Sequence, residues 1–206
     1  MGVEGVVLAA GFSSRVGVNK LLLELGGRSI LDRCLGSMKQ VCSRIIIVGG
    51  HRILELEASL KPSPQLEIVF NEDYAEGMFS SVQKGIRQVR EERFFLCPGD
   101  YPLIKEQTYI DLLSQEGQII VPTCQDRPGH PVLIASRLIQ DILGGGYSSL
   151  KDFIKLHSPT LLEVPDPGIH MDVDTLEDYE NITLRFLTDE QDLRGDRIAC
   201  RENGQS

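Results

Sequence analysis

The chain has 206 residues, of which 41% are hydrophobic and 25% charged, so it can bury a sizeable core and is not a disordered chain. Its formal net charge of −9 repels polyanions, which argues against a surface for duplex nucleic acid or for an anionic membrane. The first apolar run is too short to cross a bilayer and lacks the positive flank of a signal peptide, so we expect a soluble, cytoplasmic protein. Five scattered cysteines without a C-x-x-C pair predict reduced thiols.

Short β-branched runs alternate with helical patterns along the first half of the chain. Apolar runs closed by Gly, Pro or Asn predict strands at residues 6–8, 44–48, 66–70, 94–96 and 118–121. The periodicity of the segments between them predicts helices at 29–41, 52–60, 80–90 and 105–114. Repeated strand–helix–strand units need crossover connections. They predict a three-layer α/β fold, doubly wound around a mostly parallel sheet.

The second half of the chain is less regular. Residues 131–134 are interpreted as a further strand, with an antiparallel position in a mixed sheet as one option, and residues 144–146 separate two short helical patterns. A helix is predicted over 176–186, because Thr175 and Asp178 have the spacing of a capping box. We assign residues 1–187 to one catalytic domain and the polar residues 188–206 to a flexible tail.

The loop after the first strand carries a set of groups that suits a polyphosphate. In doubly wound sheets ligands bind beyond the carboxyl ends of the strands, where such loops lie. Residues 11–20 offer backbone N–H groups, two serine hydroxyls and the cations Arg15 and Lys20. The spacings of the P-loop and of G-x-G-x-x-G are both absent. A solvated surface turn therefore remains an alternative interpretation of this loop.

Five blocks of the sequence resemble one family. Leu8-Ala-Ala-Gly11, followed by Ser13, Arg15, Gly17 and Lys20, is similar to the signature loop of nucleotidyltransferases of the molybdopterin family. Four further blocks follow in that family's order, at residues 71–81, 98–102, 129–133 and 172–178. The resemblance covers about residues 4–186. It implies a Rossmann-like nucleotidyltransferase fold of the glycosyltransferase-A-like type.

The resemblance also implies an activity. The form Ala9-Ala10-Gly11 resembles that of members that use CTP rather than GTP, the molybdenum cofactor cytidylyltransferases. Such an enzyme moves CMP to the terminal phosphate of molybdopterin with Mg²⁺, releases pyrophosphate, and passes its product to a recipient molybdoenzyme or its chaperone. One alternative is a nucleotidyltransferase for GTP or for another acceptor, such as a sugar phosphate or an isoprenoid-precursor phosphate. Another is a non-catalytic accessory protein that binds nucleotide or cofactor.

The reaction assigns roles to the charged residues of these blocks. Attack on an α-phosphorus brings anions together and loads charge onto pyrophosphate, so catalysis is expected to be positioning plus cations. Arg15 and Lys20 would neutralise the triphosphate, and Asp100 would bind the metal. The second metal ligand is Asp172 or Asp174. These residues point to opposite faces if the segment is extended, and we prefer Asp172.

The resemblance implies further binding residues. Those for the nucleotide are Leu8, Ala9, Ala10, Gly11, Ser13, Arg15, Lys20, Asn71, Gly77, Ser81, Pro98, Gly99 and Asp100. Tyr101 and His130 lie where the second substrate is expected. Plainer roles remain open, since Asp100 suits a turn, Asn71 and Ser81 suit a helix cap, and His130 suits a hydrogen-bonded loop. His130 is not assigned as a general base, because a phosphate nucleophile is already ionised near neutral pH.

Overall fold

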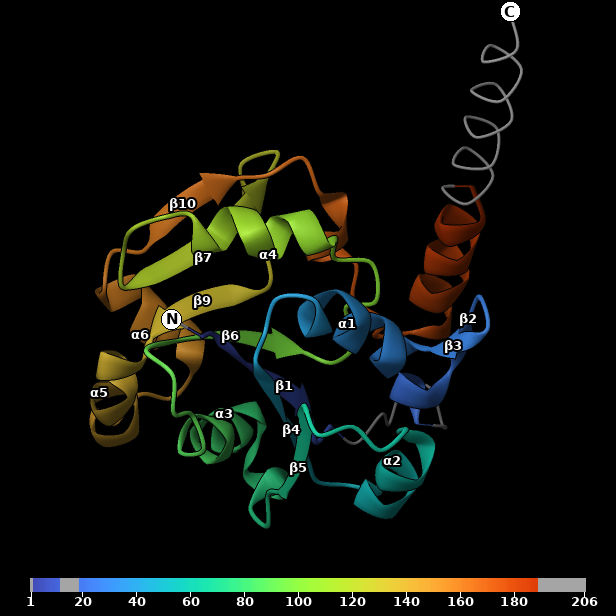
Figure 1. Ribbon diagram of the computed structural model, residues 1–206, viewed down its shortest axis with the longest axis horizontal. Helices are drawn as coiled ribbons and strands as arrows, with labels where there is room; N and C mark the ends of the chain where they lie inside the picture. Colours follow the sequence, from blue (N-terminus) through green and yellow to red (C-terminus); the bar gives the residue numbers. More distant parts are fainter. Residues whose placement is uncertain (1, 12–18, 189–206) are drawn as a thin grey trace, which may run out of the picture.

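The structure, a computed structural model, describes residues 2–11 and 19–188 of the chain (Figure 1). Two predicted site residues, Ser13 and Arg15, and the predicted tail beyond residue 188 lie outside the described residues. None of the described helices combines the length and the apolar character that a bilayer-spanning segment needs.

An eight-stranded mixed sheet forms the centre of the molecule. Its order is β10-β7-β9-β6-β1-β4-β5, with β8 paired to β7. The strands are β1 (Glu4–Ala9), β4 (Arg44–Gly49), β5 (Leu66–Phe70), β6 (Arg93–Pro98), β7 (Ile119–Cys124), β8 (Arg127–Pro128), β9 (Val132–Ala135) and β10 (Thr160–Glu163). β1 is parallel to β4 and β6, β4 to β5, and β7 to β10, whereas β9 is antiparallel to β6 and β7. The predicted mostly parallel, doubly wound sheet is confirmed, as is the antiparallel option for residues 131–134.

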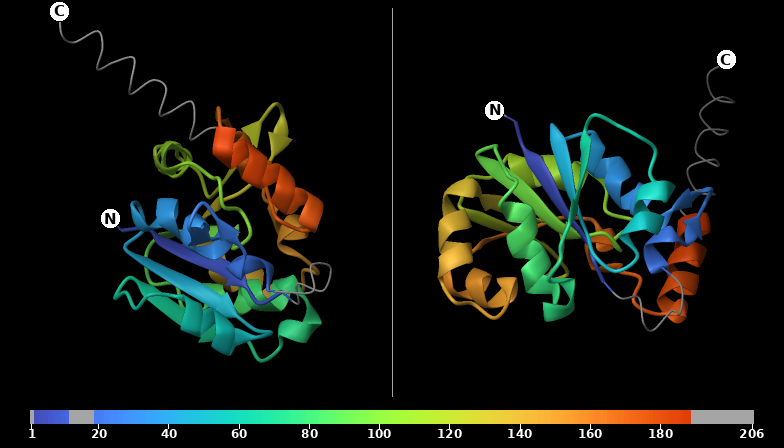
Figure 2. Two further views of the ribbon diagram at one scale, coloured as in Figure 1. Left: turned by 90° about the vertical axis from the view of Figure 1, so that its right-hand side faces the viewer. Right: turned by 90° about the horizontal axis from the view of Figure 1, so that it is seen from below.

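Helices cover both faces of the sheet (Figure 1 and Figure 2). They are α1 (Ile30–Lys39), α2 (Ile53–Ser59), α3 (Met78–Ile86), α4 (Glu106–Leu113), α5 (Ile139–Gly144), α6 (Leu150–Leu156) and a last helix over residues 176–188. Val7 and Ala9 of β1 pack in a cluster with α1, α2, α4 and the last helix, while Val6 and Leu8 pack in a second cluster with α3, α5 and α6. This alternation explains why β1 is apolar at successive positions and buried throughout.

The structure also adds elements that the sequence pattern did not predict. These are the edge strand β10, the short strand β8, and a hairpin of β2 (Glu24–Leu25) and β3 (Arg28–Ser29) before α1. Helix α3 was predicted at residues 80–90, but it spans Met78–Ile86. The predicted capping box is present, since Asp178 Oδ2 accepts hydrogen bonds from the N–H and the hydroxyl of Thr175, both at 2.8 Å.

Candidate active site

A cavity of about 260 Å³ opens at the carboxyl ends of β1 and β6. Its lining brings together residues from the loops after both strands and from the start of α3. The lining residues are Leu8, Ala9, Ala10, Gly11, Lys20, Leu21, Tyr74, Gly77, Met78, Ser81, Pro98, Asp100 and Asp174. Most of the predicted nucleotide-binding residues are in this set, but Asn71 and Gly99 are not. The set also lacks the predicted acceptor residues Tyr101 and His130 and the predicted metal ligand Asp172.

One end of the cavity is charged. Lys20 Nζ lies 2.5 Å from Asp100 Oδ2 and 2.8 Å from Asp174 Oδ1, so one ammonium group bridges two carboxylates. Burial alone would lower the pKa of Lys20, but the two carboxylates outweigh it and raise this pKa, which keeps the side chain charged. Asn19 supports Lys20, because its Oδ1 accepts a hydrogen bond from the N–H of Leu21 at 3.3 Å and caps a short 3₁₀ turn over Lys20–Leu22.

Backbone contacts fix the two carboxylate segments beside each other. The N–H of Gly99 donates to the carbonyl of Leu8 at 2.9 Å, and the N–H of Val173 donates to the carbonyl of Asp100 at 3.1 Å. A Cβ at Gly99 would lie only 3.1 Å from Leu31 Cδ1 and 3.3 Å from the Leu8 carbonyl oxygen. A glycine therefore suits the close approach of β6 to β1, because a side chain here would make its neighbours shift by a few tenths of an ångström. Pro98 and Gly99 thus place Asp100 above the end of β1.

The three predicted metal ligands do not have equal surroundings. The pKa of Asp172 is raised by burial, then by the charges of Asp100 and Asp174. Asp174, rather than Asp172, shares Lys20 with Asp100. Within residues 2–11 and 19–188, no three His, Cys, Asp or Glu side chains converge as they would to hold a metal ion. Asp100 Oδ1, however, is a buried oxygen without a hydrogen-bond partner among the described residues.

The rest of the described cavity lining is uncharged. Tyr74, in a 3₁₀ turn over Tyr74–Glu76, and Met78, at the start of α3, form part of its wall with Ala10. A Cβ at Gly50 would lie 2.6 Å from Tyr74 Cβ and 2.8 Å from Ala10 Cβ, so Tyr74 and Ala10 come close across this glycine. The sequence reasoning missed Tyr74 and Met78. Their position beside Gly77, inside one of the five family-like blocks, is the signal that could have found them.

Asn71 fixes the wall that Tyr74 belongs to. Its side chain is buried, and its Nδ2 donates to the hydroxyls of Ser80 and Ser81, each at 2.9 Å. Its backbone N–H donates to the carbonyl of Gly49 at 2.9 Å, and its Oδ1 accepts from the N–H of Asp73 at 3.2 Å. Asn71 therefore ties the end of β5 to α3, while Ser81 itself reaches the cavity.

Tyr101 and His130 pack against each other next to the charged end. Their ring centroids are 5.0 Å apart in an edge-to-face arrangement. Burial lowers the pKa of His130 to about 4, although a hydrogen bond to the backbone of Leu96 works in the opposite direction. Burial, followed by the charges of Asp172 and Asp100, raises the pKa of Tyr101. Both rings are thus neutral near pH 7, and neither lines the cavity.

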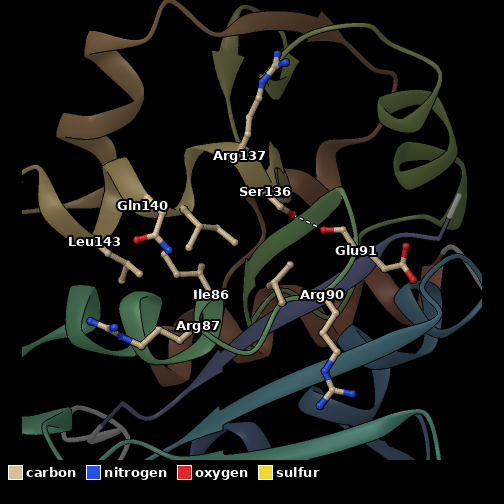
Figure 3. A pocket seen from close by; sticks show the side chains of 10 residues that line it. Ile86, Arg87, Arg90, Glu91, Ser136, Arg137, Gln140 and Leu143 are labelled. Carbon is tan, nitrogen blue, oxygen red and sulfur yellow. Dashed lines mark hydrogen bonds between the residues drawn. The ribbon is translucent and has the colours of Figure 1, made fainter.

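A second hollow, of about 530 Å³, lies at the opposite end of the sheet (Figure 3). It is found between the end of α3 and the segment Ser136–Leu143. The guanidinium groups of Arg87, Arg90 and Arg137 point away from one another in Figure 3, so they do not converge on one anion. The lining of this hollow therefore does not present a converging set of cations.

Comparisons with known proteins agree with this arrangement. The family model described as MobA-like NTP transferase domain matches residues 5–160. The molybdenum cofactor cytidylyltransferase of Escherichia coli (strain K12) is 31% identical over 186 residues, which are 89% of this chain and 97% of that protein. A probable molybdenum cofactor guanylyltransferase of Methanosarcina mazei is 26% identical, with 87% of this chain and 89% of that protein covered. A nucleotidyl transferase from Methanothermobacter thermautotroptrophicus has a similar structure, with a TM-score of 0.79 at 22% identity, covering 91% of this chain and 98% of that one.

Proposed function

The chain belongs to the family of MobA-like NTP transferase domains and is a nucleotidyltransferase, and we propose that it moves CMP from CTP to the terminal phosphate of molybdopterin. The observation that carries this proposal is a cavity whose lining combines the charged cluster of Lys20, Asp100 and Asp174 with uncharged residues. A nucleoside triphosphate has the same polarity. Its phosphates fit beside Lys20 and Asp100, and its base fits beside Ala10 and Tyr74.

The reaction forms one P–O bond and breaks another. An oxygen of the terminal phosphate of molybdopterin attacks the α-phosphorus of CTP, and the bond from this phosphorus to the bridging oxygen of the β-phosphate breaks, so pyrophosphate leaves. Lys20 and Arg15 stabilise the charge that develops on the leaving group. No side chain has to remove a proton, because the attacking phosphate is already ionised. Lowering the repulsion between these anions is the main task of the site.

Asp100 and Asp174 are the residues that would hold a divalent metal, for which we propose Mg²⁺. Two carboxylates suit this ion, which usually takes one or two of them together with waters and substrate phosphates. The unpartnered Oδ1 of Asp100 also fits, since a buried carboxylate oxygen without a donor is stabilised by a cation. When bound, such an ion would supply positive charge that polarises the phosphates.

We propose CTP rather than GTP because of the uncharged part of the cavity lining. Ala10 and Tyr74 both line the cavity and lie close together on either side of Gly50, and a wall of this kind would suit the smaller pyrimidine ring. The similarity to the cytidylyltransferase of E. coli, at 31% identity, supports the same choice. GTP is the second candidate, because the chain is also similar to a probable guanylyltransferase. Tyr101 and His130 would border the acceptor, and the product would pass to a recipient molybdoenzyme or its chaperone.

Release of pyrophosphate tests the proposal directly. The purified protein is incubated with molybdopterin, Mg²⁺ and one of CTP, GTP, ATP or UTP. We expect release with CTP, loss of release when Mg²⁺ is chelated, and loss in Asp100→Ala. Faster release with GTP would show that the protein is a guanylyltransferase rather than a cytidylyltransferase. If release requires a sugar phosphate or an isoprenoid-precursor phosphate instead of molybdopterin, the assignment of molybdopterin as the acceptor is wrong.

A further inference from the structure

Lys20 has two tasks that it cannot perform at the same time. In the proposed reaction its ammonium group neutralises the triphosphate. In the structure it lies 2.5 Å from Asp100 Oδ2 and 2.8 Å from Asp174 Oδ1. These carboxylates are the ones that would hold the metal. An ammonium nitrogen this close to both of them repels a second cation and occupies the space that it would need.

We propose that Lys20 is the resident counter-ion of the Asp100–Asp174 pair and leaves it for the triphosphate when nucleotide and divalent metal bind. The inference rests on the proposed function, because it requires a metal at these carboxylates and a triphosphate beside them. Without nucleotide, Lys20 holds the two carboxylates together and keeps their affinity for a divalent cation low. Lys20 thereby acts as a positioning residue before it contacts the substrate.

The surroundings of Lys20 suit such an exchange. A lysine ammonium is a point charge on a flexible four-carbon stem, so it can move between partners without the fixed geometry of an arginine fork. The carboxylates, in contrast, stay in place, because the Gly99–Leu8 and Val173–Asp100 backbone hydrogen bonds hold their segments. Among the residues that the structure describes, none donates to Oδ1 of Asp100, a buried oxygen that Lys20 does not reach. A divalent cation, which accepts several oxygen ligands, gains more from this pair than an ammonium group does.

The exchange makes metal and nucleotide favour each other's binding. The triphosphate offers Lys20 a new partner, and the metal replaces the charge that Lys20 withdraws from Asp100 and Asp174. Each ligand therefore removes part of the cost of binding the other, and the coupling is reciprocal. A protein built this way binds its metal weakly until the substrate is present.

Titration with Mn²⁺ in the absence of nucleotide measures the effect. Free Mn²⁺ is followed by electron paramagnetic resonance in the wild type, Lys20→Met and Lys84→Met. We expect Lys20→Met to bind Mn²⁺ about tenfold more tightly, because one positive charge is removed a few ångströms from the ligands. Lys84→Met is the matched control. It breaks an ion pair of 2.7 Å with Glu72 that does not line the cavity, so its Mn²⁺ affinity should equal that of the wild type.

The sign of the change separates this role from a general loss of structure. Lys20→Met should bind Mn²⁺ more tightly but CTP more weakly, whereas a damaged fold weakens both. Lys20→Arg keeps the charge and should keep Mn²⁺ affinity low, and Lys20→Gln replaces the methionine variant if that variant does not fold. Unchanged or weaker Mn²⁺ binding in folded Lys20→Met, with Mn²⁺ still bound by the wild type plus CTP, would overturn this inference and leave the proposed function intact. Failure of the wild type to bind Mn²⁺ even with CTP would overturn both.

Discussion

Two aspartates that stand two residues apart have different surroundings. Asp174 shares Lys20 with Asp100, while Asp172 is half-buried and has a raised pKa. We expect Asp174→Asn to lower turnover about 100-fold, as is typical when one preorganised electrostatic contact is lost. Asp172→Asn should lower turnover less than about tenfold. Pyrophosphate release at saturating CTP and Mg²⁺ measures both effects, with the melting temperature as the control for folding. A larger loss in Asp172→Asn would restore the sequence-based preference for Asp172.

Tyr74 should contribute to the choice of base. Its ring belongs to the uncharged part of the cavity lining, with its centroid 6.4 Å from that of Phe70 and 6.3 Å from that of His51. Tyr74→Ala opens this wall, so we expect the ratio of CTP to GTP turnover to fall about tenfold, the usual scale for a change of pocket shape. Tyr74→Phe keeps the ring and should keep the ratio. An unchanged ratio of CTP to GTP turnover in Tyr74→Ala would show that the base does not bind beside Tyr74.

The sequence predicted the polar residues of the site better than its apolar wall. Lys20 and Asp100 could be found because they lie in loops after strands and inside blocks that resemble those of the family. Tyr74 and Met78 could not be singled out, since residues of this kind are most often core residues. Their position in the cavity lining, and for Tyr74 also its packing against Gly50, gives them a role in the site.

The last helix holds one side of the site in place through its cap. Asp178 Oδ2 accepts from the N–H of Asp174 at 3.2 Å and from the N–H and hydroxyl of Thr175, and the hydroxyl of Thr175 accepts from the N–H of Asp178 at 3.1 Å. Asp178→Ala should cost about 1 kcal/mol of unfolding free energy. It should also lower turnover although Asp178 does not line the cavity, because the backbone of Asp174 loses its anchor. Urea unfolding and pyrophosphate release measure the two effects.

A second cap provides the matched control for this prediction. Asp152 Oδ2 accepts from the hydroxyl of Ser149 at 2.7 Å, and Ser149 caps α6 on the sheet face opposite to the last helix. Asp152→Ala should therefore lose similar stability and keep its turnover. Equal turnover losses in Asp152→Ala and Asp178→Ala would contradict a specific link between the last helix and Asp174.

Elements with a local signal were predictable, and elements made by distant pairing were not. The cap of the last helix was predicted because Thr175 and Asp178 carry it within four residues. Strand β10 was missed because Thr160–Glu163 is short and mostly exposed, and it becomes a strand only by pairing with β7, about 40 residues earlier in the chain. The start of α3 was misplaced because its N-cap residue is Gly77, which has no side chain to make a capping hydrogen bond.

At the scale of the whole molecule, strand order creates the site. β1 lies between β4 and β6, so the loops after β1 and β6 open at the same edge of the sheet. The doubly wound, mostly parallel sheet could be predicted from the alternating strands and helices, whereas the strand order was not predicted. The meeting of Asp174 with Lys20, which are 154 residues apart, has no local signal and follows only from this topology together with the family-like blocks.

The stability of the whole domain should depend on pH through two groups in particular. Burial lowers the pKa of His130 from 6.5 to about 4. Burial alone would raise the pKa of Glu4, but two backbone N–H groups and the guanidinium of Arg44 hold it below its usual 4.5. In both cases the unfolded state binds a proton at a higher pH than the folded state does. Unfolding free energy is therefore lost as the pH falls, through His130 between pH 6.5 and 4 and through Glu4 below pH 4.5.

Urea unfolding at a series of pH values separates the two contributions. The wild type should lose about 2 kcal/mol between pH 7 and pH 4.5, most of it through His130. The His130→Asn variant has no titratable group at position 130. Its unfolding free energy should therefore change much less between pH 7 and pH 4.5 than that of the wild type, even if the substitution changes the stability at pH 7. Glu4→Gln should follow the slope of the wild type above pH 4.5 and become flatter than it below. Parallel curves for His130→Asn and the wild type would show that His130 takes up its proton in the folded state as readily as in the unfolded one.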